Sequence, residues 1–246
     1  MKATAFEFRI RFFIHVVLIV LGFTVPWDRW LHLDSLGPNP HVWGMLAAHL
    51  FKLSPNVLTV GGAFNLLLAL AAVCAVVSAA LRTWASAYMG PATVHSSGMH
   101  GDGLVAAGPY RHLRNPLYVG IVIHVVALAL LMPPSGAIFC IVTVVLFQLR
   151  LIGGEEAFLT QKLGEPYLAY CARVPRLFPA LTPRVPASSA RPAWAMAFLS
   201  EIYMWGVAVT YIGLGHRYNA SILEQGILIS LGVMLIVRAL VPRRDA

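Results

Sequence analysis

The segment "GPYRHLRNPLYVG", residues 108–120, places polar side chains directly before a long apolar stretch and could bind a charged ligand. A residue that precedes proline avoids the α conformation, whereas proline itself suits the first position of a helix. We therefore expect Asn115 to cap a helix that begins at Pro116. The free N–H groups at the start of that helix could bind an anion or another hydrogen-bond acceptor.

The charged and aromatic residues around this helix start have two interpretations. Arg111, His112 and Arg114 precede the helix, and Tyr118 lies in its first turn. Taken singly, each arginine is also typical of the basic residues on the cytoplasmic side of a membrane protein, and the tyrosine of an interfacial aromatic belt. A nearby partner of opposite charge would favour a binding site.

The adjacent acids Glu155 and Glu156 supply such a partner. The chain has only ten Asp and Glu residues, so a pair beside an apolar stretch is unusual. The pair could instead be the solvated start of a helix, where acids are favourable. However, Pro133 and Pro134 predict a tight turn that joins two apolar stretches as a helical hairpin. We therefore expect the glutamates to approach residues 115–118 at the membrane surface.

A third polar segment is "GEPYLAYCARVPRLFP", residues 164–179. Gly164 can end a helix, and Pro166 suits the first turn of the next one. Tyr167 and Tyr170 are three residues apart and should face one side of that second helix. The two arginines of the segment could pair with the glutamates or with lipid phosphates, and an amphipathic helix on an anionic leaflet would explain them as well.

Composition indicates an integral membrane protein. Hydrophobic residues make up 59% of the 246 residues and charged residues 11%, with a mean hydropathy of +0.74. Soluble domains have about 25% charged residues. The net charge of +8 could suggest a nucleic-acid partner, but its distribution along the chain argues for membrane topology instead. The three cysteines are scattered and predict neither a disulfide framework nor a zinc site.

The fold class that we expect is all-α, with about six transmembrane helices, a helical hairpin core and a cytoplasmic cofactor-binding segment. The apolar stretches are residues 12–27, 57–81, 116–132, 135–152, 193–214 and 221–240. Each is near the roughly 17–25 residues of a membrane-spanning helix. With both termini in the cytoplasm, three basic residues face outward, namely Arg29, Lys52 and Arg217, and the other fifteen of the eighteen, Arg82 among them, face inward. This is a strong positive-inside bias.

Three regions follow from this pattern. Residues 1–81 hold two transmembrane helices and an outer loop, in which residues 41–51 could form an interfacial helix. Residues 82–182 hold an inner loop, the hairpin and a cytoplasmic helix. Residues 183–246 hold a proline-rich linker and the last two spans. No small-residue cleavage site follows the first stretch, so we expect an uncleaved span.

The polar segments together resemble the superfamily of isoprenylcysteine carboxyl methyltransferases and phospholipid methyltransferases, which are integral membrane enzymes. The similarity lies in "GPYRHLRNPLYVG" and in "GGEEAFLTQKLGEPYLAYCARVPRLFP", residues 153–179. It includes the order, the spacing and the position of both segments on the hairpin. It covers about residues 82–182.

The resemblance implies an enzyme that uses S-adenosyl-L-methionine to methylate a lipophilic or membrane-accessible acceptor at the cytoplasmic interface. By position, it implies that the cofactor is bound by His95, Asp102, Gly103, Leu104, Val105, Tyr110, Asn115, Pro116, Leu117, Tyr118 and Glu155. It implies catalytic roles for Arg114, Arg150 and Glu156, and no metal. Methyl transfer from a sulfonium needs mainly proximity and alignment, which a pocket at the inner helix ends could provide.

Two positions depart from the family pattern. Asn115 stands where the family has histidine; asparagine can form hydrogen bonds but cannot act as a base near neutral pH. The family's arginine one turn before the glutamates aligns with Leu151, and Arg150 is one place away. We assign Arg150 as a cation on the acceptor side.

Several alternatives stay open from the sequence. The acceptor could be a prenylated cysteine carboxylate, a phospholipid amine or a small thiol, and the oligomeric state is not indicated. An NADPH-dependent reductase of the sterol-reductase type would share a similar hairpin, and a non-catalytic scaffold or transporter would bind no cofactor. A metal site at His95, His100 and His112 matches no standard ligand spacing.

Overall fold

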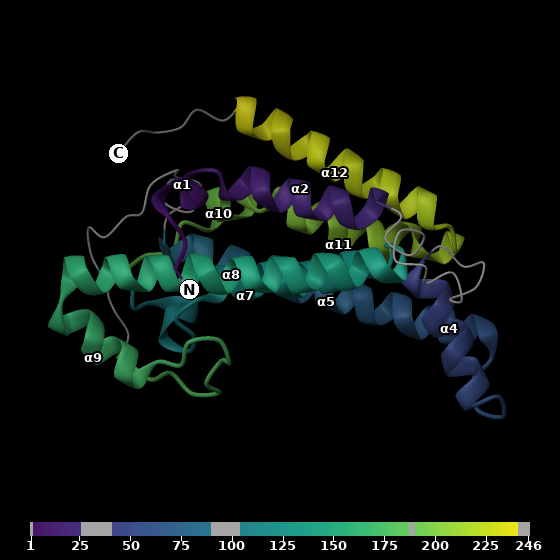
Figure 1. Cartoon of the computed structure of the whole chain (residues 1–246), viewed down its shortest axis with the longest axis horizontal. Coiled ribbons are helices and arrows are strands. Elements are labelled where there is room, and N and C mark those ends of the chain that lie inside the picture. Colours follow the sequence, from purple (N-terminus) through teal and green to yellow (C-terminus); the bar gives the residue numbers. More distant parts are fainter. Residues whose placement is uncertain (1, 26–40, 90–103, 187–189, 241–246) are drawn as a thin grey trace.

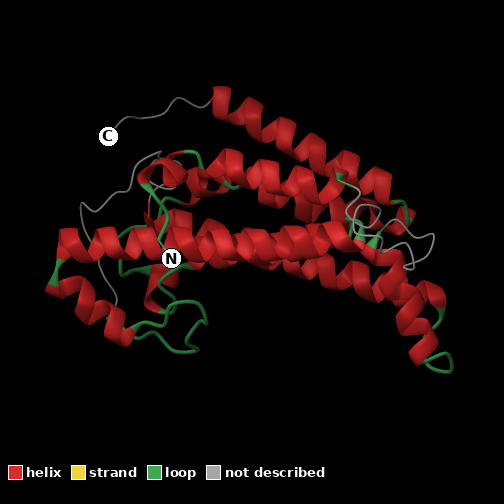
Figure 2. Ribbon diagram, in the orientation of Figure 1, coloured by secondary structure: helices red, strands yellow, loops and turns green. Residues whose placement is uncertain are grey.

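The computed structural model describes residues 2–25, 41–89, 104–186 and 190–240. Within these ranges the chain is built of helices, with no strand (Figures 1 and 2). The helices are α1 (Ala5–Arg9), α2 (Arg11–Thr24), α4 (Val42–Leu53), α5 (Val60–Met89), α7 (Pro116–Ala129), α8 (Pro134–Leu163), α9 (Glu165–Arg173), α10 (Trp194–Ser200), α11 (Ile202–Leu214) and α12 (Ala220–Leu240).

Three of the described helices, α5, α8 and α12, are long and apolar enough to cross a membrane. A fourth candidate is the pair α10 and α11, which is bent by 68° at a short break. The six spans that the sequence predicts are therefore found in part: α2 and α7 are apolar but have only 14 residues each. These helices indicate an integral membrane protein.

The helical hairpin predicted from Pro133 and Pro134 is confirmed. Helix α7 ends at Ala129, and α8 begins at Pro134 and packs along it. The predicted end at Gly164 is also confirmed: α8 ends one residue before it, and Gly164 has a φ of 62°, which favours glycine. Helix α9 then begins in a new direction (Figure 1).

Two boundaries differ from the prediction. Helix α5 continues to Met89, so the expected inner loop at 82–115 starts within a helix. Helix α8 continues without a break through both glutamates, which rules out the solvated helix start that we weighed for them. Both helices have 30 residues and span about 45 Å, longer than the roughly 30 Å apolar core of a bilayer. Each helix is therefore long enough to extend beyond that core.

Small residues allow the helices around the hairpin to pack closely. The buried face of α5 carries Ala71, Ala75 and Ser78, and the Ser78 hydroxyl donates a hydrogen bond of 2.7 Å to the Gly120 carbonyl of α7. Helix α2 lies along α8, where a Cβ atom added to Gly136 would lie 1.9 Å from the Gly22 carbonyl oxygen. This packing positions α2, α5, α7 and α8 around one interior space.

The predicted helix at 41–51 is confirmed as α4, but it packs on protein. Trp43 is buried, and its indole N–H donates a hydrogen bond of 3.1 Å to the Phe64 carbonyl of α5. The backbone N–H of Trp43 donates to the Leu130 carbonyl at the hairpin turn. Helix α4 therefore supports the end of the hairpin that lies far from the polar segments (Figure 1).

Candidate functional site

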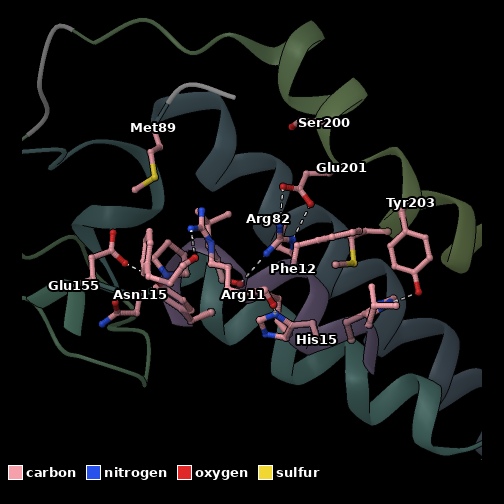
Figure 3. Close-up of a pocket in the computed structure, with 18 of the residues that line it drawn as sticks. Arg11, Phe12, His15, Arg82, Met89, Asn115, Glu155, Ser200, Glu201 and Tyr203 are labelled. Carbon is pink, nitrogen blue, oxygen red and sulfur yellow. Dashed lines mark hydrogen bonds and ion pairs between the residues drawn. The ribbon is translucent and has the colours of Figure 1, made fainter. Parts of the chain in front are cut away.

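A cavity of about 830 Å³ lies between the hairpin and the helices α2, α11 and α12. Figure 3 shows part of its lining. One end is lined by polar residues, which include Tyr110, Asn115, Tyr118, Glu155, Glu156 and Tyr170. The other end is lined mainly by apolar residues, which include Ile19, Val20, Phe23, Ile227, Leu228 and Leu231. Helix α7 lines both ends, from Tyr118 to Leu128, about 15 Å further along its axis.

The two predicted clusters meet at the polar end. The Tyr118 hydroxyl donates a hydrogen bond of 2.5 Å to Oε2 of Glu155, and Nδ2 of Asn115 donates one of 3.1 Å to Oε1 of Glu156. Asn115 is the N-terminal cap position of α7, as predicted, but its side chain bonds to α8 rather than to its own helix. The hairpin thus brings together residues that are 37 and 41 positions apart.

The third polar segment closes over the same end. The Tyr170 hydroxyl donates a hydrogen bond of 2.8 Å to the Tyr110 carbonyl, and Nδ2 of Asn115 also donates to the Arg176 carbonyl at 3.1 Å. The backbone of Arg114 donates to the Pro175 carbonyl. Tyr167 and Tyr170 are both buried, which confirms that they face one side of α9.

Tyr110 is held in a short 3₁₀ helix, Gly108–Arg111, that leads into α7. Its side chain is buried, and its hydroxyl donates to Sδ of Met89, at the end of α5, over 3.5 Å. Burial raises the pKa of the Tyr110 hydroxyl well above its ordinary value, helped by the nearby Glu155. The hydroxyl is therefore protonated at physiological pH. The Tyr110 side chain also lines the cavity.

The other predicted cofactor residues fall into two groups. Leu104, Val105, Pro116 and Leu117 line the cavity next to those already described. His95, Asp102 and Gly103 lie outside the described residues, as does His100, so no position is given for them.

The structure places only two of the three predicted catalytic residues at this cavity. Arg114 and Glu156 lie together at the cavity, with 3.6 Å between Arg114 Nε and Glu156 Oε1. Arg150 does not join them: its Nη2 donates to both carboxylate oxygens of Glu7 on α1, at 2.8 and 2.9 Å. Instead, Arg176 Nε bonds Glu156 Oε2 at 2.9 Å.

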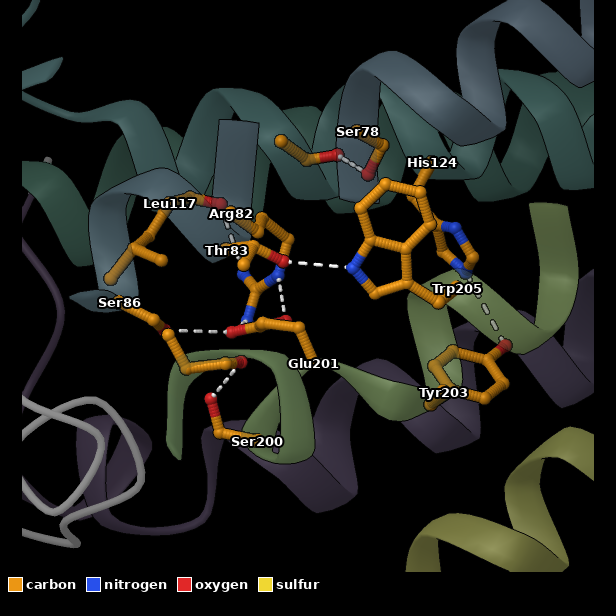
Figure 4. A network of polar contacts seen from close by, with 12 residues as sticks. Ser78, Arg82, Thr83, Ser86, Leu117, His124, Ser200, Glu201, Tyr203 and Trp205 are labelled. Carbon is orange, nitrogen blue, oxygen red and sulfur yellow. Dashed lines mark hydrogen bonds and ion pairs between the residues drawn. The ribbon is translucent and has the colours of Figure 1, made fainter. Parts of the chain in front are cut away.

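A buried ion pair that sequence reasoning missed forms one wall of the cavity (Figure 4). Arg82 of α5 donates to both carboxylate oxygens of Glu201, at 2.7 and 2.9 Å, and its Nη1 donates to the Leu117 carbonyl at 3.1 Å. The Ser86 hydroxyl donates to the same carboxylate at 3.0 Å. Arg82 was assigned to the positive-inside set; instead, it is buried and paired.

A signal for this pair was present in the sequence. Glu201 is the only acid in the apolar stretch "AWAMAFLSEIYMWGVAV", residues 193–209. An acid in a membrane segment usually has a partner and a function. The structure places Glu201 at the break between α10 and α11, where its carboxylate turns toward α5 (Figure 4).

Further along the cavity, His124 of α7 lies against Tyr203 of α11 (Figure 4). Nε2 of His124 is 3.3 Å from the Tyr203 hydroxyl, and the imidazole is buried. These two side chains are polar groups within the largely apolar half of the cavity.

Comparison with known proteins finds one family that matches part of the chain. Residues 64–165 match the family model described as phospholipid methyltransferase. This segment is therefore similar to the phospholipid methyltransferase family. Among curated proteins and solved structures, no match to the chain was found.

The phospholipid methyltransferase segment contains the hairpin and both predicted clusters. It starts in α5 and ends at the first residue of α9, so it includes Asn115, Tyr118, Glu155 and Glu156. The resemblance predicted from the sequence is thereby confirmed. Helices α2, α11 and α12, which complete the apolar half of the cavity, lie outside it. The family and the apolar helices together support a membrane methyltransferase in general terms.

Proposed function

We propose that this protein transfers a methyl group from S-adenosyl-L-methionine to a lipophilic or membrane-accessible acceptor at the cytoplasmic surface of the membrane. The observation that carries this proposal is the single cavity with a polar end, built by the two clusters of the phospholipid methyltransferase segment, and a contiguous apolar end. A polar cytosolic cofactor and an apolar acceptor could both reach such a cavity.

The chemistry of the polar end fits the cofactor. S-adenosyl-L-methionine, when bound, supplies a methyl group on a positively charged sulfonium. Glu155 accepts a hydrogen bond from the Tyr118 hydroxyl through Oε2, and its second oxygen could accept one from the ammonium or a ribose hydroxyl of a ligand. The rings of Tyr110 and Tyr118 could lie against the sulfonium or the adenine, since aromatic faces attract cations.

Backbone and apolar groups complete the proposed cofactor site. Leu104 and Val105 line the cavity on the chain leading to the 3₁₀ helix, and Pro116 and Leu117 line it at the start of α7. The positive end of α7 favours a carboxylate or another acceptor there. His95, Asp102 and Gly103 stay assigned by position in the resemblance alone.

The residues around Glu156 have a positioning role in this proposal. Glu156 accepts a hydrogen bond from Asn115, forms an ion pair with Arg176 and lies near Arg114. It therefore joins α7, α8 and the segment after α9 into one wall. Asn115 cannot act as a base near neutral pH. We therefore assign it to holding this wall in place, because alignment of the reacting groups supplies much of the rate in such a displacement.

The apolar half defines the side from which an acceptor enters. Side chains of α2 and α12 line it, and both helices expose many large apolar residues elsewhere on their surfaces, as helices in contact with lipid do. The excess of basic residues on one side of the expected spans would place the polar end toward the cytoplasm.

Calorimetric titration with S-adenosylhomocysteine tests the proposal. The detergent-purified protein should bind it, and Glu155→Gln should weaken binding at least about tenfold, which corresponds to about 1.4 kcal/mol. Glu165→Gln is the matched control, because Glu165 is exposed on α9 and lines no part of the cavity. If folded wild-type protein does not bind, or Glu155→Gln binds as tightly as wild type, the assignment is wrong.

A further inference from the structure

A second cavity, of about 790 Å³, lies on a different face of α8 from the first. Gly153, Ala157 and Thr160 line the second cavity, whereas Glu155 and Leu159 line the first. These two sets are about two fifths of a turn apart around the helix, at 3.6 residues per turn. Glu156 lies between them and lines both cavities.

The second cavity is lined mainly by cations. Lys2, Arg114, Arg150 and Arg176 line it, and Glu156 is its one acidic lining residue among those that the structure describes. These cations come from the N-terminal segment, the loop before α7, α8 and the segment after α9. Glu7 does not line the cavity but forms an ion pair with Arg150. When Glu7 is counted with Glu156, the four cations and two acids leave a net formal charge of +2.

Hydrogen bonding at Glu156 leaves part of this charge unmatched. Nδ2 of Asn115 donates a hydrogen bond to Oε1 of Glu156, and Arg176 forms an ion pair with Oε2. Arg114 Nε is 3.6 Å from Oε1, too far for a hydrogen bond, and this buried donor has no hydrogen-bond partner among the described residues. Buried donors in proteins are nearly always satisfied. The described cations at the cavity therefore carry more positive charge than the acids beside them neutralise.

The apolar neighbours of these cations point to a lipid. Leu146 and Leu149 of α8 and Leu168 of α9 line the cavity and are 37–50% exposed. Arg150 follows directly after the apolar half of α8, which runs from Pro134 to Leu149. The lining thus changes from apolar to cationic along one helix face, in the same order as the acyl chains and headgroups of a membrane leaflet. Basic pockets between membrane helices are known to bind anionic headgroups.

We propose that this second cavity binds the phosphate-bearing headgroup of an anionic membrane lipid, with the headgroup at Lys2, Arg150 and Arg176 and an acyl chain along Leu146 and Leu149. The two cavities share Arg114 and Glu156 in their walls, but Lys2, Arg150 and Arg176 line the second cavity alone. The proposal does not depend on the function proposed for the first cavity. It also gives Arg150 a role, since the structure places this residue away from the first cavity.

Lipid titration of the full-length protein in zwitterionic detergent tests the site. Dioctanoyl phosphatidylglycerol, dioctanoyl phosphatidylcholine and inorganic phosphate are added separately, and bound ligand is counted by native mass spectrometry. Phosphatidylglycerol should bind best. Lys2→Gln and Arg150→Gln should each weaken it about fivefold, as expected for one cation near an anionic headgroup. Arg150→Lys should keep most of the binding.

Arg173→Gln is the matched control, because Arg173 is exposed on α9 outside the cavity. Thermal unfolding of each variant verifies that it is folded. Equal binding of the two lipids, or binding unaffected by Lys2→Gln and Arg150→Gln, would overturn the site. Phosphate that binds as tightly as phosphatidylglycerol and displaces it would overturn the lipid assignment in favour of a free anion.

Discussion

Arg82 and Glu201, 119 residues apart in the chain, form a bidentate ion pair inside the protein, with N–O distances of 2.7 and 2.9 Å. Only 7% of Arg82 and 2% of Glu201 is exposed. The pair joins α5, within the phospholipid methyltransferase segment, to the bend between α10 and α11, outside it. It therefore fixes how the C-terminal helices close the cavity.

Removal of one partner of this pair should destabilise the protein strongly. Glu201→Leu leaves the Arg82 guanidinium buried without its counter-charge, and such changes cost about 3–5 kcal/mol. The double variant Arg82→Met, Glu201→Leu removes both charges and should regain much of this loss. Thermal unfolding in detergent measures both, with Arg173→Gln as the surface control. A double variant as unstable as Glu201→Leu would contradict this account.

The hydrogen bond from Tyr118 to Glu155 should contribute to cofactor affinity. Tyr118→Phe keeps the ring but removes a donor to a carboxylate, and such bonds contribute about 1.5–3 kcal/mol. We expect S-adenosylhomocysteine to bind roughly tenfold to a hundredfold more weakly. Tyr203→Phe serves as the matched variant, because Tyr203 lies at the apolar half of the cavity beside His124. Similar losses in the two variants would argue against a specific role for Tyr118.

The hairpin and the meeting of its two clusters could be predicted because their signals are local. A proline pair predicts a turn, a proline after asparagine predicts a helix start, and a glycine before Pro166 predicts a helix end. Each of these features is confirmed. Once the turn places α7 and α8 side by side, the approach of Asn115 to Glu156 follows from their positions along the two helices.

The contacts that the sequence did not predict join distant segments. Arg82 was read as a topology signal because an arginine after an apolar stretch is typical of one, and its partner is far away in sequence. Arg150 was assigned to the acceptor side, but the N-terminal segment contacts it on α8. The backbone N–H of Ala3 donates to the Arg150 carbonyl, and the Glu7 carboxylate accepts hydrogen bonds from the Arg150 side chain. Spacing within one segment contains no information on such pairs.

Close packing between α2 and α8 should be sensitive to a single methyl group. Gly136→Ala would place a Cβ atom 1.9 Å from the Gly22 backbone, which cannot move as a side chain does. Overpacking of this kind costs about 1–3 kcal/mol. Gly61→Ala is the matched control, since a Cβ there meets no atom within 4 Å and alanine favours a helix. Unfolding temperatures in detergent should fall for Gly136→Ala alone; equal shifts would refute the close approach.

Attachment of the N-terminal segment to α8 should depend on pH through Glu7. A hydrogen bond from the Thr4 backbone N–H, with a further contribution from Arg150, lowers the pKa of Glu7 below its ordinary value of 4.5. Because the folded pKa is the lower one, the stabilisation is complete above 4.5 and is lost as the pH falls through the folded value.

Hydrogen exchange of residues 3–10, corrected for intrinsic rates, measures this attachment. Protection should be constant from pH 7 to about pH 5 and should decrease below the ordinary carboxyl pKa. Glu7→Gln cannot form the ion pair with Arg150, so its protection should be lower than that of wild type at neutral pH and should change little on acidification. Wild-type protection that is the same at pH 6 and pH 3 would show that the Glu7–Arg150 contact does not hold α1 in place.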